Sequence, residues 1–228
     1  MVGGKKRVTG KPRSLASPTP NASTNFLTLK SELPCELIPA DYFRLLRPEE
    51  IFPDALAAPC EIDVGCGDGS FLIRMAEHFP DRNFLGLERL QGRVRKVARA
   101  ADRLGLTNVR VLRLESSYVL GWLLPEGLAT RIHLLFPDPW PKKRHHHHRF
   151  VNAENLAAIH RVLRPGGQFL FKTDHEEYFQ AASGIVDAMP CFRRAWPLSD
   201  GEFYPLTDFE QQWLKQGKSI HAARWERL

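Results

Sequence analysis

The sequence predicts one doubly wound α/β domain, in which a mostly parallel sheet carries helices on both of its faces. Three observations support this fold class. From Cys60 onward, short apolar segments alternate with stretches of helical period. A glycine-rich turn follows the first of these strands, and an acidic residue stands next to the end of every strand that can be placed. The length of 228 residues allows one sizeable core.

Five segments are predicted strands because they are short, apolar and bounded by turn residues: 61–64, 83–87, 109–114, 131–136 and 168–172. Three segments between them place apolar residues at helical spacing: 70–79, 91–104 and 153–163. Gly105 is placed to end the second helix and Asn152 to cap the third, which stops at the turn 164–167. A further helix followed by a strand is expected within 183–200. Strands joined by helices in this way read as right-handed parallel crossovers.

The net charge of +6 belongs to the N-terminal segment. Residues 1–31 contain six Lys or Arg and no acid, and the rest of the chain holds 26 basic and 26 acidic residues. Because residues 1–25 are rich in Gly, Pro, Ser and Thr, we expect a disordered basic tail there. Residues 26–57 form an expected extension that packs on the core, with a short helix around 41–46. Residues 58–228 form the main domain.

Composition disfavours several classes of protein. The four cysteines show no C-x-x-C spacing, which indicates reduced structural thiols and a cytoplasmic location rather than a zinc knuckle. No apolar run approaches the roughly 18 residues of a membrane span, and the tail has no apolar segment typical of a secretory signal. We therefore expect no membrane span and no metal, and either a monomer or a homodimer.

Acidic side chains stand at successive ends of the predicted strands: Asp63, Glu88, Glu115, Asp138 and Asp174. In doubly wound sheets, ligands bind in the crevice beyond the carboxyl ends of the strands. Acids are also common in loops, but five at successive strand ends favour one lined site over coincidence. The sequence therefore predicts an acidic crevice.

The turn DVGCGDG at 63–69 is the first candidate for ligand binding. Its glycines, among them Gly65 and Gly67, permit positive φ and a close approach of the backbone to a ligand at the helix N-terminus. Glu88 lies 19 residues after Gly69, at the end of the next strand, where a carboxylate can accept hydrogen bonds from both ribose hydroxyls. The pairing favours a nucleoside cofactor.

The acids in this turn favour a methyl donor over a dinucleotide. A dinucleotide requires G-x-G-x-x-G and a pyrophosphate, whereas this turn has G-x-G-x-G and carries Asp63 and Asp68, which would repel that anion. S-adenosylmethionine has no phosphate, and its ammonium and sulfonium groups are attracted by acids. Glu115 and Ser116 are placed near its adenine; a solvated loop acid explains Glu115 equally well.

The segment FPDPWPKKRHHHHRF at 136–150 combines reactive groups with a stiff backbone. Its prolines hold Asp138 near the crevice mouth, and Trp140 offers a flat face on which a base can stack. Four basic residues suited to phosphates follow: Lys142, Lys143, Arg144 and Arg149. The alternative is a proline-rich loop with a buried Trp and a solvated basic face. Residues 145–148, all His, are expected to extend the basic surface rather than to bind a metal.

Together these motifs resemble the bacterial tRNA (guanine-N7-)-methyltransferase family over about residues 58–228. The resemblance is carried by DVGCGDG, Glu88, FPDPWPKKRH, TDHEEY at 173–178 and LTDFE at 206–210. The glycine turn is shared by many methyltransferases, whereas the proline loop and the late Thr-x-x-Glu are much more specific. The resemblance implies a Rossmann-like class I methyltransferase fold, S-adenosylmethionine as cofactor, and methylation of a guanine N7 at position 46 in the tRNA variable loop.

Site residues of this family carry over by motif. Those implied at the cofactor are Asp63, Glu88, Glu115 and Asp138, of which Asp138 is also the implied catalytic residue. Those implied to bind tRNA are Lys142, Asp174, Thr207 and Glu210. The family more often has Glu at position 63 and a bulky residue at 66, a departure that is conservative for contacts with ribose or methionine. It also has more Lys or Arg at 145–148, so the tRNA contact is expected to be weaker or more sensitive to pH here.

Two alternatives remain open at this point. One is a methyltransferase that acts on another RNA, a protein or a small molecule, and the other is a noncatalytic RNA-binding protein with this fold. The Arg-rich predicted helix 91–104 and the basic loop after Trp140 favour an RNA substrate over a small molecule. Intact acids at the strand ends favour an enzyme.

Overall fold

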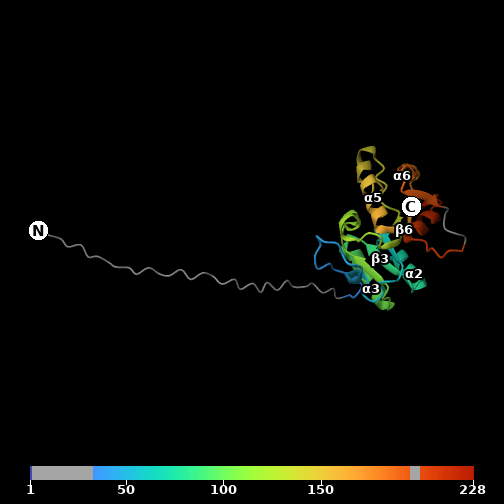
Figure 1. Cartoon of the computed structure of the whole chain (residues 1–228). Helices are drawn as coiled ribbons and strands as arrows, with labels where there is room; N and C mark the ends of the chain where they lie inside the picture. Colours follow the sequence, from blue (N-terminus) through green and yellow to red (C-terminus); the bar gives the residue numbers. More distant parts are fainter. Residues whose placement is uncertain (2–32, 196–200) are drawn as a thin grey trace.

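In the computed structural model, residues 33–195 and 201–228 are described, together with Met1 (Figure 1). The strands in these parts of the chain form one sheet in the order β1-β4-β3-β2-β5-β6-β8-β7. Their bounds are Glu36–Leu37 (β1), Cys60–Val64 (β2), Asn83–Leu87 (β3), Val109–Leu112 (β4), Ala129–Leu135 (β5), Leu163–Thr173 (β6), Phe192–Ala195 (β7) and His221–Arg227 (β8). Neighbouring strands from β1 to β6 are parallel, and β8 is antiparallel to both β6 and β7. The predicted doubly wound, mostly parallel sheet is confirmed.

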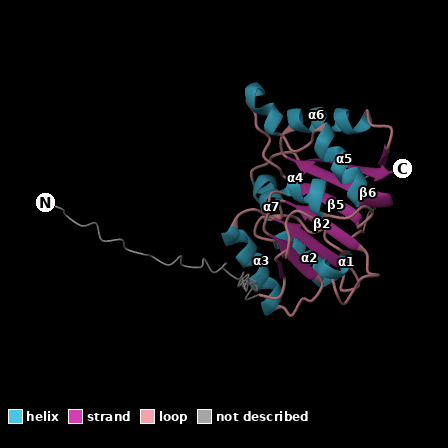
Figure 2. Ribbon diagram, turned by 60° about the vertical axis from the view of Figure 1, so that its left-hand side comes forward, coloured by secondary structure: helices cyan, strands magenta, loops and turns pink. Residues whose placement is uncertain are grey.

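Helices enclose the sheet on both sides (Figure 2). The α-helices are Pro48–Ile51 (α1), Ser70–His78 (α2), Gln91–Arg103 (α3), Ser116–Tyr118 (α4), Ala153–Val162 (α5), Glu176–Asp187 (α6) and Asp208–Lys215 (α7). A π-helix covers Val119–Leu123 (η1), and a 3₁₀-helix covers Lys143–His148 (η2). Buried residues of α2 and α3 form one apolar cluster, whereas those of α1, η1, α5 and α6 form the other. No helix among the described residues is long and apolar enough to cross a membrane.

Alternation along β2 decides which side chains reach each face of the sheet. All five residues of β2 are buried. Ile62 belongs to the apolar cluster that α5 and α6 cover. Because successive strand residues point to opposite faces, Glu61 and Asp63 lie together on the face that carries α2 and α3. A buried strand therefore brings two acids to one side of the sheet.

The segment 41–46 is not a helix, so that expectation is wrong. Asp41 Oδ1 accepts a hydrogen bond from Phe43 N at 2.8 Å, which closes a local turn. Helix formation would also require Leu46 N to bond Tyr42 O, but both groups are used elsewhere: Leu46 N donates to Leu123 O at 2.8 Å, and Tyr42 O accepts from the hydroxyl of Tyr118 at 2.8 Å. The short helix forms later, at α1.

The turn after α5 is present, although β6 begins earlier than predicted. Leu163 pairs with Ala129, and the next pair joins Gln168 to Arg131. Residues 164–167 therefore loop out between two rungs of the ladder, with Gly166 at φ 74°. The predicted strand 168–172 is the regular part of β6.

Helix α6 and strand β7 only partly match the expectation for 183–200. The helix begins at Glu176, where His175 Nδ1 accepts from Tyr178 N at 3.2 Å, and β7 follows it. Residues 196–200 lie outside the described part of the chain, as do residues 2–25 of the predicted tail. Sequence patterns did not reveal β1, α7 or β8. Strand β1 has two residues and pairs with β4 beside the buried Cys35.

Candidate active site

A cleft of about 770 Å³ opens at the carboxyl ends of β2 to β5, where doubly wound sheets bind their ligands. Most of the predicted site residues line it: Asp63, Gly65, Gly67, Glu88, Glu115, Ser116, Asp138 and Thr207. Lys142, Asp174 and Glu210 are not among the lining residues. The cleft gathers residues from five separate sequence segments. Four of the five predicted strand-end acids are among them, whereas Asp174 is not, and the fifth segment is 207–212.

The glycine turn needs its glycines for two different reasons. Gly65 and Gly67 have φ of 73° and 60°, a left-handed conformation that side chains disfavour, and a Cβ at either would meet no atom within 4 Å. Gly69, the N-cap of α2, has φ 83°, and a Cβ there would come within 2.7 Å of Val97 in α3. The first two glycines leave the backbone open to the cleft, and the third allows the helices to pack.

Asp63 and Glu88 form a buried acidic pair in the cleft wall, with 3% and 5% of their surfaces exposed. Burial, and after it the charge of Glu88, raises the pKa of Asp63 to about 7. Glu88 accepts a hydrogen bond from Leu90 N at 2.8 Å, and its Oε2 lies 3.6 Å from a guanidinium nitrogen of Arg93. Such a pair favours a ligand that brings positive charge.

Glu115 has a local structural role in addition to its place in the wall. It is the N-cap of α4, and its carboxylate accepts hydrogen bonds from the amides of Ser117 and Tyr118 at 3.0 and 2.8 Å. The side chain is exposed. Ser116 follows it along the same wall. Capping explains why an acid stands here, and it also fixes the carboxylate at the cleft edge.

Two non-glycine residues with positive φ bracket the proline loop: Phe136 at 52° and Trp140 at 43°. Such conformations are costly and concentrate at functional sites. Asp138, between them, accepts a hydrogen bond from Trp140 N at 3.1 Å and is exposed to the cleft. The prolines predicted a stiff segment, whereas the left-handed turns at its two ends follow only from the structure. The loop holds Asp138 at a fixed place in the wall.

Arg149 anchors this loop and is not available to phosphates, so its predicted place on the basic surface is wrong. It is buried, its Nε donates to Pro139 O at 2.9 Å, and its guanidinium binds the carboxylate of Glu177, with one bond at 3.1 Å. The guanidinium also lies 4.8 Å from the centre of the Tyr178 ring. Arg149 therefore points inward, unlike its exposed basic neighbours, because Glu177 and the ring of Tyr178 in α6 bind its guanidinium.

The histidine run forms the 3₁₀-helix η2 rather than an irregular loop. Trp140 lines the cleft, with its ring centre 4.8 Å from that of His148 and 5.9 Å from that of His145. Lys142, the residue before η2, is exposed. Among the described residues, no group of three or more His, Cys, Asp or Glu is arranged to hold a metal ion.

Helix α3 presents a basic face at the rim of the cleft. Its apolar residues, such as Val94 and Val97, are buried against α2 and the sheet, which leaves its charged residues in solvent. The exposed basic residues on and next to this helix are Arg89, Arg93, Arg95, Lys96, Arg99 and Arg103. Three of them, Arg89, Arg93 and Lys96, line the cleft. An acidic interior therefore meets a basic edge.

The predicted tRNA-binding residues of the C-terminal region occupy different surroundings. Thr207 lines the cleft and caps α7, with its hydroxyl accepting from Glu210 N at 3.0 Å. Glu210 is buried and forms an ion pair with Lys172 at 2.9 Å, and its second carboxylate oxygen has no partner. Asp174 forms an ion pair with Lys218 at 2.9 Å. These last two acids are therefore paired with lysines and do not line the cleft.

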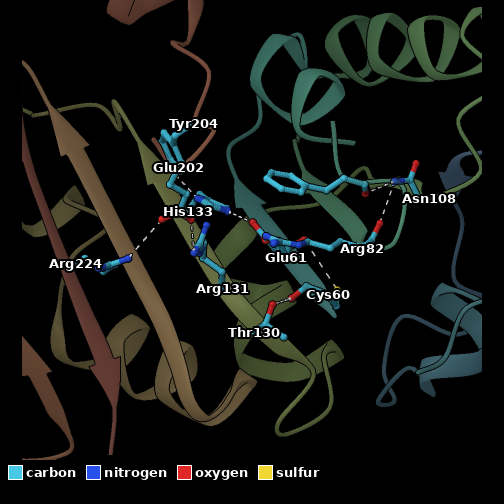
Figure 3. A network of polar contacts seen from close by, with 11 residues as sticks. Cys60, Glu61, Arg82, Asn108, Thr130, Arg131, His133, Glu202, Tyr204 and Arg224 are labelled. Carbon is cyan, nitrogen blue, oxygen red and sulfur yellow. Dashed lines mark hydrogen bonds and ion pairs between the residues drawn. The ribbon is translucent and has the colours of Figure 1, made fainter. Parts of the chain in front are cut away.

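A buried polar network beneath the cleft was not found by sequence reasoning (Figure 3). His133 in β5 bonds both Glu61 in β2 and Tyr204, each at 2.8 Å, and Arg82 pairs with Glu61 at 2.8 Å. The available signal was the polar residues inside apolar strands: Glu61 in CEIDV, and Arg131 and His133 in ATRIHLL. Charged residues at alternating positions of a buried strand indicate partners on one face.

Comparisons with known proteins agree with this fold. A family model described as putative methyltransferase matches residues 57–223. A curated tRNA (guanine-N(7)-)-methyltransferase of Syntrophotalea carbinolica is 33% identical over 166 residues, which cover 72% of each chain. The protein of the same name from Chromohalobacter salexigens is 36% identical over 169 residues, 72% of this chain and 69% of that relative.

Solved structures share the fold. A crystal structure of the 16S rRNA (adenine(1408)-N(1))-methyltransferase from Catenulisporales acidiphilia, with its cosubstrate SAM, is similar with a TM-score of 0.55 and 19% identity, and it covers 80% of this chain and 92% of that chain. Identity at that level shows a common architecture alone. The match to the family model over most of the chain, together with relatives above 30% identity, shows that the chain belongs to the tRNA (guanine-N7-)-methyltransferase family.

Proposed function

We propose that this protein transfers a methyl group from S-adenosylmethionine to N7 of a guanine in tRNA, at position 46 of the variable loop. The observation that carries this proposal is the arrangement of charge around one cleft: a buried acidic pair inside, and exposed basic residues with an aromatic ring at the mouth. A cationic cofactor fits the interior and a polyanion fits the rim. Membership of the family supplies the acceptor atom.

The residues present suit the cofactor. Asp63 and Glu88 supply negative charge where the ammonium, the sulfonium and the ribose hydroxyls require acceptors, and the backbone at Gly65 and Gly67 leaves room beside them. Glu115 and Ser116 are assigned to the adenine end. When bound, S-adenosylmethionine supplies an electrophilic methyl group, whose bond to sulfur breaks as the bond to N7 forms, so that the sulfonium becomes a neutral thioether.

The acceptor needs alignment rather than a general base, because guanine N7 has a free lone pair and no proton to lose. Positive charge arrives on the purine during the transfer, which makes its N1–H and amino group better hydrogen-bond donors. Asp138 lies exposed in the cleft wall on a stiff loop and is assigned to accept these bonds. Asp174 is a weaker candidate for the same task because Lys218 already pairs with it.

The tRNA backbone is assigned to the basic rim. Arg89, Arg93 and Lys96 line the cleft, and residues 142–144 are exposed just after Trp140 along the chain; both groups offer cations for phosphates. Trp140 lines the cleft and offers its ring to a base. Thr207 and Glu210 place the start of α7 beside the same opening. We assign the protein to the cytoplasm, where its substrate is found.

One experiment separates this function from its alternatives. The protein is incubated with S-adenosylmethionine labelled in its methyl group and with bulk tRNA, and the tRNA is digested to nucleosides. Labelled 7-methylguanosine is the expected product, and mapping it to the variable loop identifies position 46. Label in another nucleoside, in protein or in a small molecule shows a different methyltransferase. No transfer at all, with tRNA binding retained, shows a noncatalytic RNA-binding protein.

A further inference from the structure

The C-terminal arm, residues 202–215, contacts residues of β5, β6 and β8 and forms part of the cleft wall. Thr207, Asp208, Phe209 and Gln212 of the arm line the cleft. Phe203 stacks on His78 of α2 with ring centres 3.8 Å apart. Tyr204 also packs on Phe71, with ring centres 4.9 Å apart. Polar contacts also join the arm to the body: Glu202 with Arg131 and Arg224, Tyr204 with His133, Arg74 with Leu206 O and Asp208, and Glu210 with Lys172. The position of this wall therefore depends on a small number of directional contacts.

The first anchor joins Tyr204 to His133, whose other ring nitrogen bonds Glu61 (Figure 3). Burial raises the pKa of Glu61, but the hydrogen bonds from His133 and Arg82 and the charge of Arg131 outweigh it and lower that pKa to about 2. Glu61 is therefore ionised and can only accept. Burial lowers the pKa of His133, so the imidazole is neutral.

These protonation states fix the direction of every bond in the chain. Because the Glu61 carboxylate only accepts, the Nε2–H of His133 donates to it, and Nδ1 carries the lone pair. The hydroxyl of Tyr204 must then donate to Nδ1 at 2.8 Å. Burial, followed by the charge of Asp63, raises the pKa of Tyr204 well above its usual range, so this hydroxyl keeps its proton. In this anchor, the hydroxyl of Tyr204 is the donor and His133 Nδ1 is the acceptor.

The second anchor is Glu202, two residues earlier in the arm. Its carboxylate lies 2.8 Å from a guanidinium nitrogen of Arg131 in β5 and 3.9 Å from one of Arg224 in β8. Arg131 and His133 occupy alternate positions of β5 and so point to the same face. One strand thus receives both anchors, whereas the polar contacts of Arg74 and the ion pair of Lys172 reach the arm only from Leu206 onward.

We propose that Tyr204 and Glu202 are positioning residues, which through His133 and Arg131 set the register of the C-terminal arm so that its Thr207 to Phe209 wall faces the reacting guanine. Neither side chain lines the cleft. Thr207 follows Tyr204 by only three residues. A shift of Tyr204 therefore also shifts the part of the cleft wall that begins at Thr207. The inference rests on the proposed function for its substrate and on the anchors themselves for its geometry.

The variant Tyr204→Phe tests the hydrogen bond while it preserves the packing. The ring remains available to Phe71, with ring centres 4.9 Å apart, and to the Lys172 ammonium, 4.7 Å from the ring centre. The variant removes the donor to His133 Nδ1, which becomes a buried acceptor without a partner. Glu202→Gln tests the second anchor by removing the charge that Arg131 and Arg224 share.

The matched control is Thr130→Val. The hydroxyl of Thr130 donates to Cys60 O at 3.0 Å, so this variant also deletes a partly buried hydrogen bond between β5 and β2. It does so at the opposite end of β5 from the cleft. A loss of stability alone would affect the control and the test variants alike.

Methyl transfer to tRNA and binding of S-adenosylmethionine are measured for all four proteins. We expect kcat to fall about ten-fold in Tyr204→Phe and in Glu202→Gln, because the bound guanine is less well aligned. The KM for tRNA should change less than three-fold, since the basic rim is intact, and cofactor affinity should change less than two-fold. Thr130→Val should match the wild type in all three quantities. Unchanged kcat in both test variants would overturn the proposal.

Hydrogen exchange of the free protein decides the geometry independently of activity. Amides of the first turn of α7, such as those of Glu210 and Gln211, should exchange several-fold faster in Tyr204→Phe than in the wild type or in Thr130→Val. If the wild type makes no 7-methylguanosine, the proposed function fails and the exchange data still test the anchors. If the wild type is active but neither kcat nor exchange changes in the variants, the proposed function stands and the positioning role is wrong.

Discussion

Asp63 and Glu88 lie at the ends of neighbouring parallel strands, and the charge of Glu88 adds to burial in raising the pKa of Asp63 to about 7. A cationic ligand that enters the cleft reverses both effects in part and favours the ionised form of Asp63. Binding of S-adenosylmethionine should therefore release a proton near neutral pH. The two acids supply more than hydrogen bonds, because they couple cofactor binding to pH.

Cofactor affinity should follow the ionisation of Asp63. For a group with a pKa of about 7, lowering the pH from 8 to 6 reduces the ionised fraction about ten-fold, so the Kd for S-adenosylmethionine should rise by about that factor. Titration calorimetry at several pH values, in buffers of different ionisation enthalpy, measures both Kd and proton release. In Asp63→Asn the affinity should be low and should not vary with pH. A wild-type Kd that is flat between pH 6 and 8 contradicts this linkage.

The same carboxyl should make the free protein less stable as the pH rises. Its folded-state pKa of about 7 exceeds the ordinary value of 3.8, so between these values the folded protein binds more protons than the unfolded chain, and stability falls with increasing pH. Asp63→Asn carries no such charge. Its Tm in the absence of ligand should exceed that of the wild type at pH 8, and the difference should shrink at pH 5. A Tm difference independent of pH shows that Asp63 does not titrate in this range.

Asp138→Asn should lower kcat by about a hundred-fold, with the affinities for cofactor and tRNA nearly unchanged. The size follows from the loss of a charged acceptor aimed at charge that develops only in the transition state. The amide keeps the shape of the side chain and its bond from Trp140 N. Single-turnover rates with saturating tRNA and cofactor measure the chemical step directly. A fall of only a few-fold, with affinities unchanged, would exclude this role for Asp138.

Much of the fold could be predicted from the sequence because the hydrophobic period of a strand or helix is visible within a short stretch of residues. The bounds of β3 and the first residue of α3 agree with the prediction. Strand β3 is buried on both faces and so reads as a short apolar run, and α3 buries one side and so repeats apolar residues at helical spacing. The prediction of a helix at 41–46 failed for the opposite reason: Leu46 N donates to Leu123 O and Tyr42 O accepts from Tyr118, and both partners are distant in sequence. Contacts between distant segments leave no local period, so such a pattern cannot report them.

The position of a site residue was predictable where the fold leaves its side chain one place to point, and was not predictable where the side chain can point either outward or inward. Acids at the ends of buried strands, such as Asp63 and Glu88, reach the cleft by topology alone. An arginine in a basic run can either bind phosphates at the surface or form a buried ion pair. Only the packing of α6 shows that Arg149 points inward to Glu177. Tyr204 left no signal in the sequence, because its partner His133 lies 71 positions away.

Arg149→Gln should reduce both stability and catalysis, in contrast to Arg144→Gln. Arg149 holds Pro139 O and Glu177 from a buried position, so its loss should lower the free energy of unfolding by about 2 kcal/mol, less than a fully buried pair because Glu177 is half exposed. The freed loop should lower kcat through Asp138. Because Arg144 is exposed, Arg144→Gln should weaken tRNA binding without changing Tm. Denaturant unfolding and tRNA titration of both variants make the comparison. Equal effects of the two substitutions on stability would contradict the anchoring role.

Deletion of residues 1–25 should weaken tRNA binding and leave the chemistry intact. The deletion removes Lys5, Lys6, Arg7, Lys11 and Arg13 from a chain whose remaining part is close to neutral. Removing one cation that neutralises a tRNA phosphate lowers the slope of log Kd against log salt by about 0.7 to 0.9. Titrations with tRNA at salt concentrations from about 50 to about 200 mM should therefore show a weaker affinity, and the affinity should depend less steeply on salt. Cofactor affinity and the identity of the methylated nucleoside should not change, because the cleft is built from residues 63–212. Loss of cofactor binding on this deletion would show that the N-terminal boundary of the folded domain lies further toward the first residue.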